Sequence, residues 1–298
     1  MLTKRLLVII ILTVFTFSLI SCGKNTAQDS DKDISNPRII IQNQDVELNY
    51  DGEIVASGCY SKMKLSDEVQ AKYPKLKPVI DRFNNDWKKD FDENIPTDSL
   101  TAGDLKMMAE EASGIQSGEL YYDIAASVPR FDEHLFIVKY DLSYDMGGPH
   151  GYNFTYASTY NPNSGEIVKL SDTVKNKAKL AEIIARKIYK IDPEFEYSDY
   201  SNCITGQPYK SSDLDQAKEL FKEMISDDEI TWILNDKGLN IVFSEYDLAP
   251  HGNGGEFDFT IPYDELEKII KPEYIMTNSQ DMDKIVKTEE LPVKRFTK

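Results

Sequence analysis

The sequence predicts an α+β protein, in which antiparallel sheets pack against helices and two structural units follow a flexible stalk. Three observations favour this fold class. Alternating apolar residues indicate several strands, apolar residues at three- and four-residue steps indicate amphipathic helices, and segments rich in Gly, Asn and Pro separate neighbouring strands. The elements run as strands, helices, strands and a final helix. This order is typical of α+β domains.

The N-terminus resembles the signal of a bacterial lipoprotein. Lys4 and Arg5 precede an apolar run at residues 6–20, which only Thr and Ser interrupt and which is short for a membrane span. The run ends in Leu-Ile-Ser-Cys at residues 19–22, which fits a lipobox. We therefore expect cleavage before Cys22, lipidation of Cys22 and an extracytoplasmic protein, at the cell surface or on the periplasmic face of a membrane. An ordinary signal peptide with a chance cysteine and an uncleaved anchor are the alternatives.

The rest of the chain divides by composition and length. The segment after Cys22 has little apolar content up to residue 37, so burial cannot offset the entropy of ordering it. The residues that follow are too many for one small module and suit two compact units. We expect a signal peptide at 1–21, a flexible linker at 22–37, an N-terminal α+β domain at 38–129, a second domain at 130–273 and a charged, loosely held tail at 274–298.

The composition is strongly acidic. The chain has 51 Asp and Glu against 34 Lys and Arg, a formal net charge of −17, and loss of Lys4 and Arg5 with the signal would bring this to −19. Because phosphate binding depends on Lys and Arg patches, we expect no nucleic-acid partner. An acidic surface steers cationic partners at low salt, although it also serves solubility.

In the first unit we expect strands at 38–42 and 45–50, joined by an Asn-containing turn. A long helix follows, because its apolar residues share one face: Leu76, Val79, Ile80, Phe83, Trp87 and Phe91. We interpret Trp87 on this stripe as a core residue. A second helix at 102–112 and a strand with alternate apolar residues at 120–128 complete the unit.

In the second unit the pattern begins with a strand, a tight glycine-rich loop and a returning strand. The expected elements are strands at 135–144, 152–160 and 166–170, turns at 147–151 and 161–165, helices within 172–189 and after Ser212, a hairpin at 232–243, a glycine-rich loop at 250–255, a strand at 256–261 and a helix at 263–270. Tyr152, Phe154, Tyr156 and Tyr160 fall on one face of their strand. We favour a core role for this face over a ligand platform, because strand aromatics commonly pack against helices.

Motifs in the second unit resemble a known family. The segment Tyr-Asp-Leu-Ser-Tyr at 140–144, the loop Gly-Gly-Pro-His-Gly at 147–151 and the stretch 238–266, with Tyr246 and a closing Thr-Ile-Pro-Tyr-Asp-Glu-Leu, are similar in this order to the C-terminal domain of the RsiV-like anti-sigma factors. The resemblance covers about residues 131–272. Here Pro149 replaces the usual Ala of the loop, which restricts the backbone before His150. Residues 38–129 resemble more weakly the companion domain of RsiV-like proteins and of the deacetylase PdaC.

The resemblance implies an extracytoplasmic binding or sensing domain of the type that binds lysozyme, a cationic muramidase. Direct control of a sigma factor is not expected, because only residues 1–5 precede the apolar run, and the catalytic domain of PdaC has no counterpart here. A cell-wall glycan such as peptidoglycan is the alternative ligand, since analogy of fold is a weak guide to a partner. The candidate binding loops contain Gly147, Gly148, His150, Gly151, His251, Gly252 and Asn253.

A hydrolase that uses His150 and His251, with Asp145 and Asp258 nearby, is the remaining hypothesis. No HExxH, GxSxG or paired-Cys motif accompanies these histidines, so we expect no catalysis, metal or cofactor. In an exported protein, Cys59 and Cys203 permit one disulfide, and two buried thiols are the alternative.

Overall fold

The computed structural model describes residues 38–97, 100–115, 118–147, 150–197, 209–249, 256–276 and 278–297. The α+β fold class is confirmed. The strands are β1 (Ile39–Tyr50), β2 (Glu53–Leu65), β3 (Leu120–Phe131), β4 (Phe136–Asp145), β5 (Tyr152–Tyr160), β6 (Glu196–Tyr197), β7 (Tyr209–Lys210), β8 (Thr231–Asn235), β9 (Gly238–Phe243), β10 (Phe257–Ile261), β11 (Val286–Glu290) and β12 (Lys294–Thr297). The helices are α1 (Asp67–Lys72), α2 (Leu76–Asn94), α3 (Ala102–Ala112), α4 (Leu170–Thr173), α5 (Lys177–Ile191), α6 (Leu214–Asp227) and α7 (Tyr263–Leu266), with 3-10 turns η2 (Pro272–Tyr274) and η3 (Met282–Lys284).

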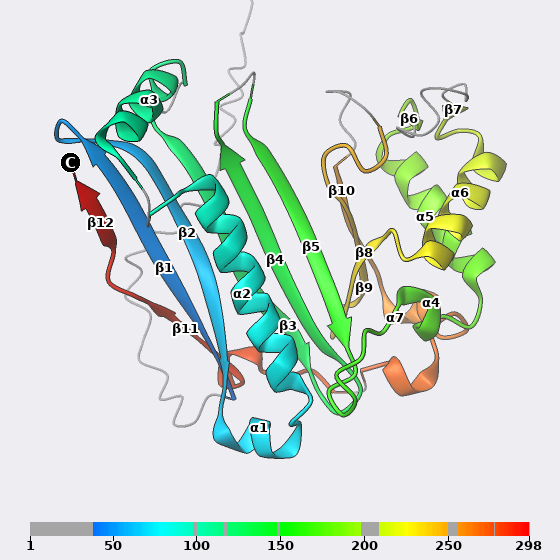
Figure 1. Ribbon diagram of the computed structural model, residues 1–298. Coiled ribbons are helices and arrows are strands. Elements are labelled where there is room, and N and C mark those ends of the chain that lie inside the picture. Colours follow the sequence, from blue (N-terminus) through cyan, green and yellow to red (C-terminus); the bar gives the residue numbers. More distant parts are fainter. Residues whose placement is uncertain are drawn as a thin grey trace, which may run out of the picture.

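A seven-stranded mixed sheet forms the larger layer. Its order is β11-β1-β2-β3-β4-β5, and β12 pairs with the same strand as β11. The β1–β2, β3–β4 and β4–β5 pairs are antiparallel, whereas β2 and β3 are parallel and are joined through α1, α2 and α3. Figure 1 shows α2 crossing one face of this sheet diagonally, which leaves the upper part of β4 and β5 uncovered on that side.

The first hairpin differs from the expectation. β1 is one continuous strand, and the turn to β2 is Asp51-Gly52. Both turn residues have positive φ (51° and 88°), the conformation that an Asp-Gly pair favours in a two-residue hairpin. The Asn-containing segment that predicts a turn lies inside β1, where the buried apolar positions change from odd at Ile41 to even at Val46. β2 was not predicted, because burial on both of its faces removes the alternation.

The helix α2 is confirmed and organises the first core. Its apolar stripe packs on β2 and β3, where Trp87 is 4% exposed and Phe91 is fully buried. The Asn84 side chain also accepts from the Met63 N–H (2.7 Å) and donates to the Met63 carbonyl (2.9 Å), so it satisfies the edge of β2 where pairing with β3 has ended. Trp87 is therefore a core residue, as the sequence predicts.

The large sheet is shared between two cores. On β4, Phe136 and Val138 belong to the core under α2, whereas Ile137 belongs to a second core that contains α5, α6 and the three-stranded sheet β10-β9-β8. Because side chains alternate along a strand, one strand serves both cores. The sheet thus continues across the expected domain boundary at residues 129 and 130.

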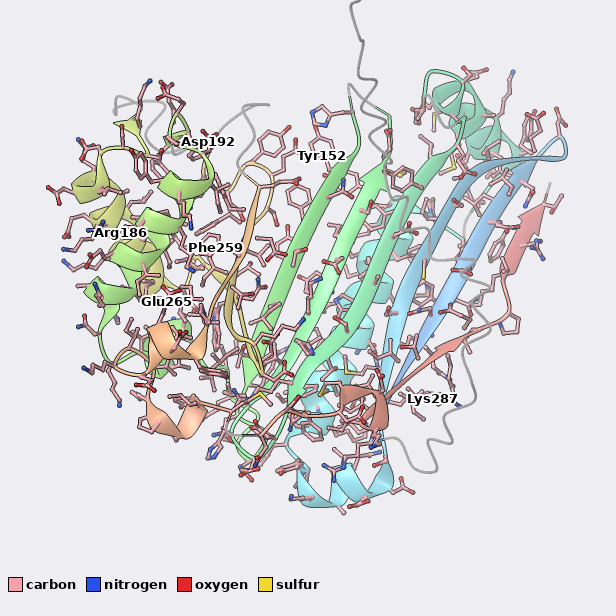
Figure 2. All side chains as sticks on the ribbon, turned by 180° about the vertical axis from the view of Figure 1, so that it is seen from behind. Tyr152, Arg186, Asp192, Phe259, Glu265 and Lys287 are labelled. Atoms are coloured by element: carbon pink, nitrogen blue, oxygen red, sulfur yellow. The ribbon has the colours of Figure 1, made fainter. Side chains whose placement is uncertain are left out.

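The C-terminal segment is held, contrary to the expected loose tail at 274–298. β11 and β12 pair in parallel with β1, and the Gln280 side chain bonds both the N–H (3.2 Å) and the carbonyl (2.7 Å) of Phe131. These strands form an exposed edge of the sheet, where charged residues such as Lys287 point outward (Figure 2). Their sequence therefore lacks the apolar alternation from which a strand is predicted.

Two shorter segments also differ. Residues 166–170 contribute one isolated bridge, between Ile167 and Tyr160, followed by α4 in place of the expected strand. The final helix α7 ends at Leu266 and not at residue 270, and Ile270 instead makes a bridge to Val174. In the described ranges, no helix is both long and apolar enough to cross a membrane.

Candidate functional site

Aromatic rings line the face of the large sheet beside α2. They come from alternate positions of three adjacent strands and form what we call the aromatic floor: Tyr122, Tyr140, Tyr144, Tyr152, Phe154 and Tyr156. Tyr140 lies directly opposite Tyr156 in the β4–β5 register, and Tyr144 opposite Tyr152. In both pairs the ring centroids are 5.1 Å apart with planes at 27°. Such cross-strand contacts hold the rings in a fixed array.

Exposure of these rings changes along β5. Tyr160 is 3% exposed, because Phe83 of α2 packs edge-on against it (5.8 Å). Tyr156 is 39% exposed, and Tyr152 and Phe154 are partly exposed. The favoured core interpretation therefore holds for Tyr160 and is wrong for Tyr156, because the diagonal path of α2 covers one end of the strand and not the other (Figure 1).

Carboxylates of α2 border one side of the aromatic floor. The hydroxyl of Tyr122 donates to Asp90 (2.8 Å). The pKa of Tyr140 is raised to about 12, mainly by burial and also by neighbouring Tyr156 and the negative charges of Asp90 and Asp86. Asp86 and Asp90 are four residues apart, which places both on the same face of the helix. A cation above these rings would meet negative charge from the helix side.

A second pair of carboxylates borders the opposite side. Glu245 and Asp247 follow β9, in a turn fixed to β5 because the Ser244 hydroxyl accepts from the Thr155 N–H (2.9 Å). The pKa of Tyr156 is raised first by burial and then by the charge of Asp247; that of Tyr144 is raised by burial, by Tyr152 and by Glu245. The aromatic floor thus lies between acidic residues from two different parts of the chain.

The upper end of the floor adjoins one of the predicted loops. The His150 ring lies 4.7 Å from that of Tyr152, its Nδ1 is 2.9 Å from the Gly151 carbonyl, and its Nε2 is 3.2 Å from the Tyr246 hydroxyl. Figure 2 labels Tyr152 at this end of β5. Gly147 has φ +86°, which explains a glycine there.

The other predicted site residues are placed as follows. Gly148, His251, Gly252, Asn253, Cys22 and Cys203 lie outside the described residues. Cys59 is a buried thiol on β2 whose strand neighbours include Asp45 and Asp123, and its pairing with Cys203 stays a prediction. A site that combines His150 with His251 also stays a prediction. In the described part of the chain, no cluster of three potential metal ligands occurs.

The match to a known family lies in the second half of the chain. Residues 167–264 match the family model described as "Protein of unknown function (DUF3298)". The chain contains a DUF3298 domain. Among solved structures, a DUF3298 family protein from Pseudomonas aeruginosa PAO1 is 18% identical, with a TM-score of 0.41 over 75% of this chain and 88% of that one. A member from Bacteroides fragilis is 15% identical, with a TM-score of 0.41 over 78% and 92%. No curated protein matches.

The DUF3298 domain contributes Glu245 and Asp247 to the candidate site, while the rings of the aromatic floor precede it in sequence. Sequence reasoning named the aromatic strand and Tyr246 but missed Asp86, Asp90 and both carboxylates of the turn. A helix in a 29% charged chain gives no local signal that two of its acids border a site. The alternation at Tyr152 to Tyr156 was the available signal.

Proposed function

We propose that this protein is a non-catalytic binding or sensing protein of the bacterial envelope, whose aromatic floor receives cationic side chains of a protein partner such as lysozyme. The supporting observation is the partly exposed array of rings between carboxylates on two sides. A cation over an aromatic face gains about 0.5–2 kcal/mol, and flanking carboxylates add charge-assisted hydrogen bonds. The formal net charge of −17 favours the approach of the same class of partner.

We favour a cationic ligand because carboxylates border the aromatic floor. A neutral glycan stacks on aromatic rings as well, but it gains little from the negative charge of Asp90 and Asp247. A cationic protein uses both the rings and the charge. Peptidoglycan is therefore the ligand that the experiment must separate from lysozyme.

The envelope location depends on the N-terminal signal. We propose that the chain is cleaved before Cys22 and lipidated there, which would place the aromatic floor outside the cytoplasm. Labelling cells with an alkyne palmitate analogue tests this step. We expect label on the wild-type protein and none on Cys22→Ala. Equal labelling of both would contradict the lipoprotein assignment.

Calorimetric titration with lysozyme at low and at moderate salt tests the binding. We expect measurable heat that weakens as salt rises, because screening reduces the attraction between exposed charges. Tyr156→Ala should weaken binding about tenfold or more, as removal of an aromatic contact at the centre of an interface does. Tyr189→Ala is the matched control, because Tyr189 lies on α5 and is 40% exposed, close to the 39% of Tyr156.

The outcomes separate the candidate ligands. No heat with lysozyme at either salt concentration would overturn the proposed partner. Sedimentation of the protein with isolated peptidoglycan, lost in Tyr156→Ala and kept in Tyr189→Ala, would instead assign the floor to a glycan. Equal lysozyme affinity of the two variants would place the contact elsewhere on the surface.

A further inference from the structure

The turn that carries Glu245 and Asp247 has an unusual residue at its third position. The Asp247 N–H donates to the Ser244 carbonyl (3.1 Å), and Tyr246 between them has φ +72°. A four-residue turn with positive φ at its third residue alone is a type II turn, which prefers glycine at that place. The Ser244 N–H also donates to the Asp247 carboxylate (2.6 Å), which holds the turn in this form.

Two other described residues show why Tyr246 is exceptional. Asp51 and Asp228 also have positive φ without being glycine, but the first lies in the β1–β2 hairpin turn and the second ends α6. Asp tolerates this conformation because its short polar side chain bonds locally. A tyrosine side chain is too long to bond its own backbone in this way, and the conformation itself costs about 1–2 kcal/mol. Backbone geometry alone would select glycine, so the explanation must lie in the side chain.

The Tyr246 side chain points toward the aromatic floor. Its hydroxyl is 3.2 Å from His150 Nε2, and its ring centroid is 6.1 Å from that of Tyr152. The ring therefore continues the row of aromatics from β5 onto the DUF3298 domain. The contact with His150 is exposed, and the Tyr246 side chain is partly exposed. Strain that persists at such a surface position is typical of a functional surface.

We infer that the Ser244–Asp247 turn is a ligand-contacting element that recognises the guanidinium group of arginine. The inference rests on the proposed function and names the chemistry of the same site. The Tyr246 ring offers a stacking surface for the planar group. Glu245 and Asp247, its neighbours in the turn, act on Tyr144 and Tyr156 of the floor and offer carboxylate acceptors. A guanidinium stacks on rings and bonds carboxylates in a forked geometry, whereas a lysine ammonium is a compact point charge that does neither.

Tyr246→Gly and Tyr246→Phe test the role of the ring. Glycine adopts positive φ without strain, so the unfolding temperature of Tyr246→Gly should be equal to or above that of the wild type. Its affinity for lysozyme should nevertheless fall about tenfold, because the stacking surface is lost. Phenylalanine keeps the ring and loses the hydroxyl, so it should bind within about threefold of the wild type. Equal binding by the glycine variant would overturn the inference.

Arginine and lysine homopeptides of equal length test the guanidinium preference. Wild-type protein should bind the arginine peptide about tenfold more tightly, and Tyr246→Gly should reduce this ratio. Equal affinity of the two peptides would overturn the assignment to guanidinium. Failure of lysozyme binding together with a Tyr246-dependent arginine preference would reject the proposed partner and keep the turn as the arginine-binding element. The two failures are thus distinguishable.

Discussion

The large sheet meets the DUF3298 part of the chain at two ends that are built differently. At the lower end in Figure 1, in the last residues of β3, Arg130 is 1% exposed, pairs with Asp132 (2.6 Å) and donates to the Tyr274 carbonyl (2.7 Å). At the upper end, His150 and Tyr246 meet at the surface, and Tyr246 has a strained backbone. A buried charge must be satisfied for the chain to fold, whereas exposed groups remain available to a partner. The lower end is therefore structural, and the upper end suits binding.

The largest expected effect is at the lower end. Arg130→Met should lower the free energy of unfolding by about 3–5 kcal/mol, because Asp132 loses its opposite charge and the carbonyls of Leu234 and Tyr274 lose the donor that Arg130 provides. Urea denaturation measures this. Arg186→Met is the control: its ion pair with Glu182 on α5 lies at the surface, so the change should have little measurable effect on stability. Similar losses of stability in both variants would mean that Arg130 at the lower end contributes no more than a surface arginine.

An intermediate effect is expected at Asp123, which lies on β3 opposite Ser143, near the upper end. The pKa of Asp123 is raised to about 6, mainly by burial and also by the like charges of Asp45 and Glu119, while the hydrogen bond from the Cys59 N–H partly offsets the rise. Because the folded pKa exceeds the unfolded value, the folded state binds the proton more tightly. The contribution of Asp123 to the stability of the fold should therefore fall as the pH rises from about 4 to about 6 and should stay reduced at higher pH.

Asp123→Asn tests this directly. The amide carries no charge, so the variant should be more stable than the wild type at pH 7, by about 1–3 kcal/mol, and similar to it near pH 4. Urea denaturation at both pH values measures the difference. A stability difference between the two proteins that is the same at pH 4 and pH 7 would contradict the assignment. Unlike Arg130, this buried charge lacks an opposite charge among the neighbours that set its pKa.

Local patterns in the sequence predicted much of this fold. Residue periodicity located α3 and β5 because the apolar residues of each element lie at positions that a short window reveals. It missed β2, which is buried on both faces, and β11 and β12, whose pairing with β1 joins residues far apart in the chain. Pairing of an exposed edge strand leaves no mark on its own hydrophobic pattern.

The candidate site was predictable only in part for the same reason. The alternation of Tyr152, Phe154 and Tyr156 was visible, but their exposure depends on where α2 crosses the sheet. The acidic borders come from α2 and from the turn after β9, and no spacing rule connects these segments. The strain at Tyr246 is a property of its φ angle, which a sequence does not display.

The smallest expected effect on stability is at the upper end, on the same face of β5. Tyr156→Ala should change the free energy of unfolding by about 0.5 kcal/mol, because its ring is exposed and no cavity forms. Tyr160→Ala, four residues along, should cost about 3 kcal/mol or more, because its ring is packed against Phe83 under α2. Thermal unfolding of the two variants measures the contrast. A large loss of stability in Tyr156→Ala would make the aromatic floor a structural element. A small loss of stability together with weakened lysozyme binding would mean that the Tyr156 ring contributes little to folding and serves to bind a partner.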